Sequence, residues 1–133
     1  MLNCILIVDD DNVSNYLTEK VLKSYGEVRM VTAVTDGKQA VNYLKHQCFG
    51  NDIYACPDLI LLDLNMPYYD GMELLNNSEN LGLDKNIPIV VLTSEEPTPE
   101  LKNELARMEV NYIIKPLTAD KFSEIFAKVI LNS

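Results

Sequence analysis

The sequence has little positive charge and no long apolar run. Lys and Arg number 11 against 20 Asp and Glu, which gives the 133-residue chain a net charge of −9. So acidic a chain is a poor partner for nucleic acid or an anionic membrane surface. No apolar stretch approaches the roughly 18 residues of a membrane-spanning helix, and the amino-terminal apolar run lacks the basic flank of a signal peptide. We therefore expect a cytoplasmic protein with no nucleic-acid or membrane partner.

Cysteine is also scarce. Cys4, Cys48 and Cys56 are the three cysteines of the chain, and their odd number and spacing match neither a disulfide framework nor a paired metal-ligand motif. His46 with Cys48 and Cys56 could form a metal site, but free thiols in a reducing compartment are the favoured interpretation. The sequence thus predicts three free thiols.

Length and composition favour one globular domain. A chain of 133 residues with 47% hydrophobic residues can bury about two thirds of its unfolded surface and fold without a disulfide or metal. We expect one domain over residues 1–133 and no output domain.

Five apolar segments alternate with five helical patterns. This alternation predicts an α/β fold, a doubly wound (βα)5 domain whose parallel sheet has helices on both faces. The first, third and fourth segments are the most continuously apolar and should be central, which gives a flavodoxin-like strand order 2-1-3-4-5. The expected strands cover residues 4–8, 28–33, 59–62, 87–92 and 110–114.

The first predicted helix has an apolar face. Val13, Leu17 and Val21 fall on one side with Tyr16 beside them, so we expect this side to pack on the sheet. Gly26 is expected to end the helix.

Polar residues stand where the other helices should begin. Asp36, Asp70, Thr98 and Thr118 have the positions of N-caps, and Asp70 has a glutamate three residues later, as in a capping box. Each cap supports the helix boundary that the apolar pattern predicts.

Polar groups follow four of the five predicted strands. Asp9 and Asp10 end the first strand, Asp63 the third, Thr93 the fourth and Lys115 the fifth. In the predicted strand order these ends are neighbours, so the groups should converge on one crevice at the carboxyl edge of the sheet.

The chemistry of that crevice suits a divalent cation and a phosphoryl group. Three carboxylates this close repel one another unless a cation intervenes. Oxygen ligands without His or Cys favour Mg²⁺ or Mn²⁺. A metal, a lysine and a hydroxyl around an aspartate can serve phosphoryl transfer, with the carboxylate as nucleophile.

Four motifs carry a family resemblance across essentially the whole chain. They resemble the receiver domain of two-component response regulators, in particular the stand-alone, chemotaxis-type receiver. The motifs are Val8-Asp9-Asp10, Asp63-Leu64-Asn65-Met66-Pro67 with Asp70-Gly71, Leu92-Thr93-Ser94, and Tyr112-Ile113-Ile114-Lys115-Pro116.

The resemblance implies an acceptor and a metal site. Asp63 would accept a phosphoryl group from a phosphohistidine of a sensor kinase or a histidine phosphotransfer protein. Asp10, Asp63 and the backbone carbonyl of Asn65 would bind Mg²⁺, and Asp9 would assist through a metal-bound water. The protein would be a phosphoacceptor that assists its own phosphorylation and dephosphorylation, not an enzyme.

The resemblance also implies a conformational switch and residues that set the rate of dephosphorylation. Thr93 and Lys115 would contact the phosphoryl oxygens, and Tyr112 would turn inward when Thr93 moves. The peptide bond after Lys115 is expected to be cis. Asn65 and Glu95 stand where the family tunes dephosphorylation, and both could orient a water, so we expect quick self-dephosphorylation.

Two partner surfaces are implied in the same way. The kinase would dock on the first helix near residues 12–16 and on the loop after Lys115. A downstream protein would bind the face made by the fourth helix, fifth strand and fifth helix, residues 98–126. We expect a monomer, with dimerisation, if any, in the phosphorylated form.

The chain departs from the family pattern in three places. The usual glycine before the fifth strand is missing, and Asn111 could supply the left-handed turn instead. Residues 47–57 form a longer loop than usual. Tyr68 and Tyr69 add two aromatic rings near the site.

Two alternatives stay open at the level of sequence. Asp9-Asp10-Asp11-Asn12-Val13 matches the nucleophile motif of haloacid-dehalogenase-type phosphatases, with Asp9 as nucleophile, although no second acidic metal pair follows Thr93. The chain could also be a degenerate receiver that serves only for docking, but its acceptor, metal, threonine and lysine positions are all filled.

Overall fold

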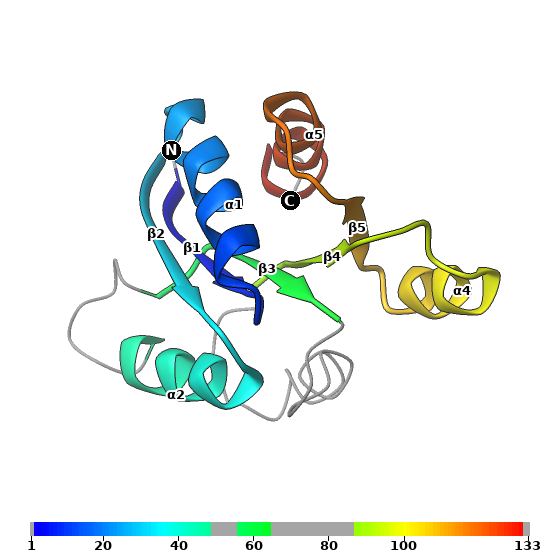
Figure 1. Ribbon diagram of the computed structural model, residues 1–133, viewed down its shortest axis with the longest axis horizontal. Helices are drawn as coiled ribbons and strands as arrows, with labels where there is room; N and C mark the ends of the chain where they lie inside the picture. The colour runs from blue at the N-terminus through cyan, green and yellow to red at the C-terminus, as the bar shows by residue number, and fades with distance from the viewer. Residues whose placement is uncertain (1, 49–55, 65–86, 132–133) are drawn as a thin grey trace.

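A computed structural model describes residues 2–48, 56–64 and 87–131 of the chain. Five parallel strands form one sheet in the order β2-β1-β3-β4-β5, which confirms the predicted fold class and strand order (Figure 1). The strands are β1 (Leu2–Val8), β2 (Val28–Val34), β3 (Leu59–Asp63), β4 (Ile89–Thr93) and β5 (Asn111–Ile114).

The central strands are buried on both faces, because helices cover the sheet on each side. All five residues of β3 are buried, whereas the edge strand β2 has no buried residue. The register pairs Val8 of β1 with Leu62 of β3, and Asp63 with Leu92 of β4. Adjacent strands therefore end at nearly the same level, which brings the residues after them to one edge.

Two helices lie on each face of the sheet among the described residues. Helices α1 (Asn12–Tyr25) and α5 (Ala119–Ile125) cover one face, and α2 (Gly37–Cys48) and α4 (Pro99–Arg107) cover the other (Figure 1). A π-helical segment, Phe126–Leu131, continues α5. The rings of Tyr25 and Phe122 join α1 to α5 in an edge-to-face contact with centroids 4.9 Å apart.

The predicted packing face of α1 is correct at Val21, which packs against the core, and wrong in the first turns. Val13, Tyr16 and Leu17 are exposed by 66%, 63% and 51%. The residues that face the sheet are Asn15, Thr18 and Leu22, with Val21 and Tyr25 partly buried beside the core. The inward side of the first turns is polar because it approaches the carboxyl edge of the sheet, where Asn15 bonds to the backbone.

Helix ends largely follow the predicted caps. The side chains of Asp36, Thr98 and Thr118 accept backbone N–H bonds from the first turns of α2, α4 and α5. Gly26 ends α1 with φ of 84°. The cap expected at Asp70 lies outside the described residues.

The left-handed residue before β5 is Glu109, with φ of 58°, and not Asn111. Just after α4, the N–H of Val110 donates to the carbonyl of Leu105 at 2.9 Å. This closure of a helix end needs a left-handed residue directly after the cap, and Asn111 already belongs to β5.

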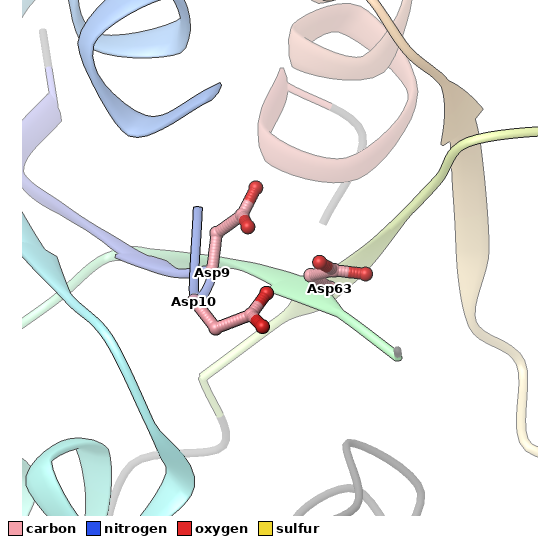
Figure 2. A group of neighbouring side chains, drawn as sticks. All are labelled: Asp9, Asp10 and Asp63. Carbon is pink, nitrogen blue, oxygen red and sulfur yellow. The ribbon is translucent and has the colours of Figure 1, made fainter. Parts of the chain in front are cut away.

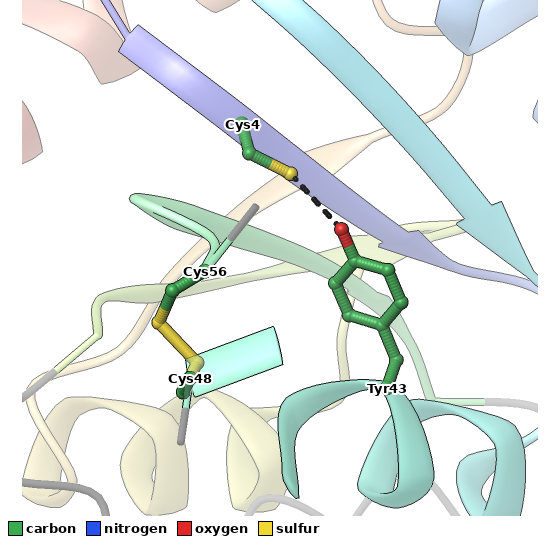
Figure 3. The surroundings of a disulfide bond; sticks show 4 residues. All are labelled: Cys4, Tyr43, Cys48 and Cys56. Carbon is green, nitrogen blue, oxygen red and sulfur yellow. Dashed lines mark hydrogen bonds between the residues drawn. A yellow bond between two sulfur atoms is a disulfide. The ribbon is translucent and has the colours of Figure 1, made fainter. Parts of the chain in front are cut away.

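The prediction of three free thiols is also wrong. Cys48 at the end of α2 forms a disulfide with Cys56, and their Cα atoms lie 4.6 Å apart (Figure 3). Packing of α2 beside the start of β3 brings these two cysteines together. Cys4 is free and buried in β1, and its sulfur lies 3.5 Å from the hydroxyl of Tyr43.

No helix among the described residues is both long and apolar enough to cross a membrane. The peptide bond between Lys115 and Pro116 is cis, as the family resemblance implied.

Candidate functional site

Three carboxylates meet at the carboxyl edge of the sheet. Asp9 and Asp10 follow β1, and Asp63 is the last residue of β3 (Figure 2). One carboxylate oxygen from each of the three lies within 4.8 Å of the others. Asp9 and Asp63 are buried and Asp10 is exposed, so the cluster opens to solvent on the Asp10 side.

Each polar group of Asp9, in its side chain and in its backbone, makes a hydrogen bond. Its Oδ1 accepts the N–H of Asp11 at 3.0 Å, and its Oδ2 accepts the Ser14 hydroxyl at 2.7 Å. Its carbonyl accepts the side-chain amide of Asn15 at 2.8 Å, and its N–H donates to the carbonyl of Val34 at 3.1 Å. Asp9 is thus anchored to both α1 and β2.

Lys115 supplies the positive charge of the site. Its Nζ lies 2.7 Å from Oδ2 of Asp9 and 3.5 Å from Oδ2 of Asp63. The N–H of Lys115 donates to the carbonyl of Thr93 at 2.7 Å, which fixes the start of the β5–α5 connection against the end of β4. The ammonium therefore bridges two carboxylates that would otherwise repel each other.

Hydrogen bonding and charge pairing outweigh burial in setting the pKa values of Asp9 and Lys115. Burial alone would raise the pKa of Asp9, but hydrogen bonds from Lys115, the N–H of Asp11 and Ser14 hold the pKa below its ordinary value. Burial alone would lower the pKa of Lys115, but the bond to Asp9 and the charge of Asp63 hold the pKa above its ordinary value. Both groups are therefore charged at neutral pH.

The hydroxyl of Thr93 lies at the end of β4 and points back to its own loop. Thr93 is buried, and its Oγ1 donates to the carbonyl of Glu95 at 2.6 Å. The Glu95 side chain is exposed. Tyr112 is partly buried on β5 and packs against the core on the α2/α4 side of the sheet, while its hydroxyl donates to Glu96 at 3.3 Å.

The donor set fits a hard divalent cation. The cluster offers carboxylate oxygens only, and two of its three members, Asp10 and Asp63, have no part in the bonds that hold Asp9 to α1. Oxygen ligands of this kind suit Mg²⁺, which keeps several of its waters. Both oxygens of Asp9 already accept protein donors, whereas Asp10 is exposed and its carboxylate faces solvent.

The structure brings together Asp9, Asp10, Asp63 and Lys115, with Thr93 on the strand next to Asp63. Asn65, the expected third ligand, lies outside the described residues, as do Tyr68 and Tyr69. Sequence reasoning missed Ser14 and Asn15. A polar pair directly after the acidic motif was the available signal, but the apolar pattern of α1 directed attention to its other side.

The sequence matches the family model described as the response regulator receiver domain over residues 5–127. The chain belongs to the response regulator receiver family. The probable methanogenesis regulatory protein FilR2 of Methanothrix harundinacea is 32% identical over 115 residues, which are 86% of this chain and 72% of that protein. Other curated relatives are much longer, and the receiver spans 16% to 22% of their length.

Solved structures agree with this assignment. A two-component response regulator from Cytophaga hutchinsonii superposes with a TM-score of 0.78 and 30% identity, over 98% of this chain and 97% of that one. The receiver domain of the sensor histidine kinase PA1611 from Pseudomonas aeruginosa has a TM-score of 0.74 and 28% identity over 94% of each chain. That structure has a magnesium ion coordinated in its active-site cleft.

Receivers of two-component systems are phosphoacceptors, and the acidic cluster of this receiver is consistent with an acceptor site. Nothing in the comparisons supports a haloacid-dehalogenase-type phosphatase. The structure is also unfavourable to Asp9 as a nucleophile, because both of its carboxylate oxygens are engaged and its side chain is fully buried.

Proposed function

We propose that Asp63 is the residue that accepts the phosphoryl group from a phosphohistidine. The observation that carries this proposal is its position at the end of the fully buried strand β3, beside Asp10 and 3.5 Å from the ammonium of Lys115. A rigid strand holds the carboxylate still, and the neighbouring cation lowers the charge that repels an incoming phosphoryl group.

The step transfers one group between two side chains. A carboxylate oxygen of Asp63 attacks phosphorus, the new P–O bond forms, and the P–N bond breaks with its electron pair returning to the imidazole nitrogen. Lys115 neutralises charge on the phosphoryl oxygens, and Thr93 donates its hydroxyl to one of them. The receiver turns over no separate substrate, so we class it as a phosphoacceptor and not an enzyme.

We assign the metal site to Asp10 and Asp63, with Asp9 contributing through a water and Asn65 through its carbonyl. Bound Mg²⁺, or Mn²⁺ in its place, would neutralise phosphoryl charge during transfer. Support comes from the all-oxygen donor set and from the magnesium ion in the related PA1611 receiver.

Switching would start at Thr93. To reach a phosphoryl group on Asp63, the Thr93 hydroxyl must leave the carbonyl of Glu95. That movement would open space near Tyr112, whose hydroxyl is held at the surface by Glu96. We infer that Tyr112 turns inward in the phosphorylated state, while Asn65 and the Glu95 side chain influence how fast water removes the phosphoryl group.

The exposed apolar side of α1 supports a kinase-docking surface. Val13, Tyr16 and Leu17 lie on the first turns of α1, directly after the acidic motif, and together form the α1 patch. We propose that a helical phosphohistidine-bearing domain of a sensor kinase or phosphotransfer protein covers the α1 patch. Its continuity with Asp10 would place the phosphohistidine over Asp63.

The β5 edge of the sheet offers an output surface. A groove of about 1340 Å³ lies between α4 and α5, with β5 beneath it. Leu105, Val110 and Ile125 contribute apolar side chains to its lining, and Lys102 and Lys128 contribute positive charge. We propose that a downstream protein binds this face, over residues 98–126, after Tyr112 has moved. The monomeric state, dimerisation on phosphorylation and a cytoplasmic location stay predictions.

Intact-mass measurement tests the acceptor. The protein is incubated with Mg²⁺ and acetyl phosphate, and its mass is compared with that of Asp63→Asn. We expect a gain of one phosphoryl group in the wild type and none in the variant. An equal gain in both would overturn the assignment, and Asp36→Asn provides a control for loss of one carboxylate elsewhere.

A further inference from the structure

One oxygen of Asp9 is shared by two donors from different elements. The hydroxyl of Ser14 on α1 and the ammonium of Lys115 after β5 each lie 2.7 Å from Oδ2. The N–H of Asp11 holds the other oxygen at 3.0 Å. These three donors fix the rotation of the carboxylate, so Oδ2 faces the ammonium.

The Ser14 hydroxyl is not needed for the helix itself. Asp11 caps α1, and it accepts the backbone N–H groups of Val13 and Ser14. Ser24, near the other end of the same helix, shows the usual helical arrangement, in which its hydroxyl donates to the carbonyl of Val21 at 2.9 Å. Ser14 instead reaches across to the site.

The next residue, Asn15, also directs its side chain to Asp9. Asn15 is 5% exposed, and its amide nitrogen donates to the carbonyl of Asp9 at 2.8 Å. Within the part of the chain that the structure describes, its Oδ1 is a buried oxygen with no hydrogen-bond partner. Leaving a buried acceptor unpaired is unfavourable, so this turn is built to hold Asp9 more than to satisfy its own side chains.

We propose that Ser14 is a positioning residue for the phosphoryl site, acting through Asp9 on Lys115. Its hydroxyl orients the Asp9 carboxylate and so keeps the ammonium of Lys115 between Asp9 and Asp63, 3.5 Å from the latter. This inference rests on the proposed roles of Asp63 and Lys115.

Ser14 also keeps Asp9 hydrogen-bonded when Lys115 moves. When the ammonium turns to a phosphoryl oxygen on Asp63, Asp9 loses one of its donors. Ser14 and the N–H of Asp11 remain, so the buried carboxylate is still hydrogen-bonded. Without the hydroxyl, the Asp9 carboxylate would no longer hold Oδ2 in a fixed direction toward Lys115, and phosphorylation would be slower.

The test compares Ser14→Ala with Ser14→Thr, which keeps a hydroxyl, and with Ser24→Ala, which removes a hydroxyl from the same helix. The rate of phosphorylation by acetyl phosphate is measured at saturating Mg²⁺. We expect Ser14→Ala to be slower by about tenfold, Ser14→Thr to recover most of the rate, and Ser24→Ala to match the wild type.

A signal from Lys115 separates positioning from general destabilisation. The ¹⁵Nζ resonance of Lys115 should shift in Ser14→Ala and stay in place in Ser24→Ala, in samples whose thermal unfolding shows them to be folded. A wild-type rate in Ser14→Ala, or a slow Ser14→Thr with an unmoved Lys115 resonance, would overturn the inference while leaving Asp63 as acceptor. Failure of the wild type to gain a phosphoryl group at Asp63 would instead overturn the proposed function.

Discussion

The ammonium nitrogen of Lys115 lies 2.7 Å from Oδ2 of Asp9, a carboxylate that is completely buried. Lys115 follows β5 and Asp9 follows β1, and β3 and β4 lie between these strands in the sheet. The ion pair therefore spans the carboxyl edge and passes beside Asp63, which stands at the end of β3. It links the stability of the fold to the chemistry of the site.

Removal of the ammonium should destabilise the protein. Lys115→Met leaves Asp9 as a buried charge without its cation, and breaking such a pair costs about 3 kcal/mol. We expect the free energy of unfolding to fall by about that amount in urea denaturation without Mg²⁺. Lys38→Met, at an exposed position in the first turn of α2, is the matched control, and equal stability of the two variants would contradict the expected role of the pair.

The ion pair between Asp9 and Lys115 also makes the stability of the fold depend on pH. The pKa of Asp9 is held below its ordinary value. The ionised carboxylate therefore contributes fully to the free energy of unfolding above about pH 3.9, and this contribution disappears as the pH falls through the pKa of the folded state. The pKa of Lys115 is raised, so its contribution is complete below about pH 10.4 and disappears as the pH rises through the folded pKa. The stability loss in Lys115→Met should therefore be largest near neutral pH. It should shrink as the pH falls and the unpaired Asp9 takes up a proton, and as the pH rises past about 10.4 and Lys115 loses its charge.

Urea denaturation of the wild type and Lys115→Met on both sides of neutral pH checks the sign. The difference in unfolding free energy between them isolates the pair from the other titrating groups. A difference that grows as the pH moves away from neutral in either direction would show that another group dominates.

The α1 patch should matter to a protein donor and not to a small one. Tyr16→Ala removes an aromatic ring from the proposed interface, and such a truncation commonly weakens binding by about tenfold. We expect slower phosphotransfer from a histidine-phosphorylated phosphotransfer protein at limiting concentration, with an unchanged rate from acetyl phosphate. Met30→Ala on β2, 36% exposed, is the control, and a Tyr16→Ala protein that is slow with both donors would place the defect in the site instead.

The disulfide should stabilise the fold in the oxidised form. Cys48 and Cys56 are eight residues apart, and closing so short a loop is worth about 2.5 kcal/mol. Reduction should lower the Tm by roughly 5 to 10 °C, and alkylation should detect two additional thiols. Cys48→Ser should not respond to reductant, and an equal Tm for oxidised and reduced wild type would contradict this contribution.

Sequence reasoning predicted the sheet because burial leaves a simple pattern in the central strands. Leu59 to Leu62 is apolar without a break, since β3 is covered on both faces. The polar residues after these strands are equally visible, and the parallel arrangement alone brings Asp10 and Asp63 to one edge.

The features that the sequence did not predict depend on tertiary contacts and backbone geometry that a residue pattern does not record. The inward face of α1 is polar at Asn15 and Thr18 because it faces the site, so an apolar pattern points to the wrong side. Pairing of Cys48 with Cys56 requires the end of α2 to lie beside the start of β3, which spacing does not reveal. The left-handed residue Glu109 follows from how α4 ends, and its side chain gives no hint of it.

The central claim concerns which aspartate is modified, and reduction of the acyl phosphate identifies it. The protein is phosphorylated with acetyl phosphate and Mg²⁺, treated with borohydride and digested, and the peptides that contain Asp9, Asp10 and Asp63 are sequenced by mass spectrometry. We predict homoserine in place of aspartate at position 63, with positions 9 and 10 unchanged. Homoserine at position 9 or 10, and aspartate retained at 63, would contradict the account.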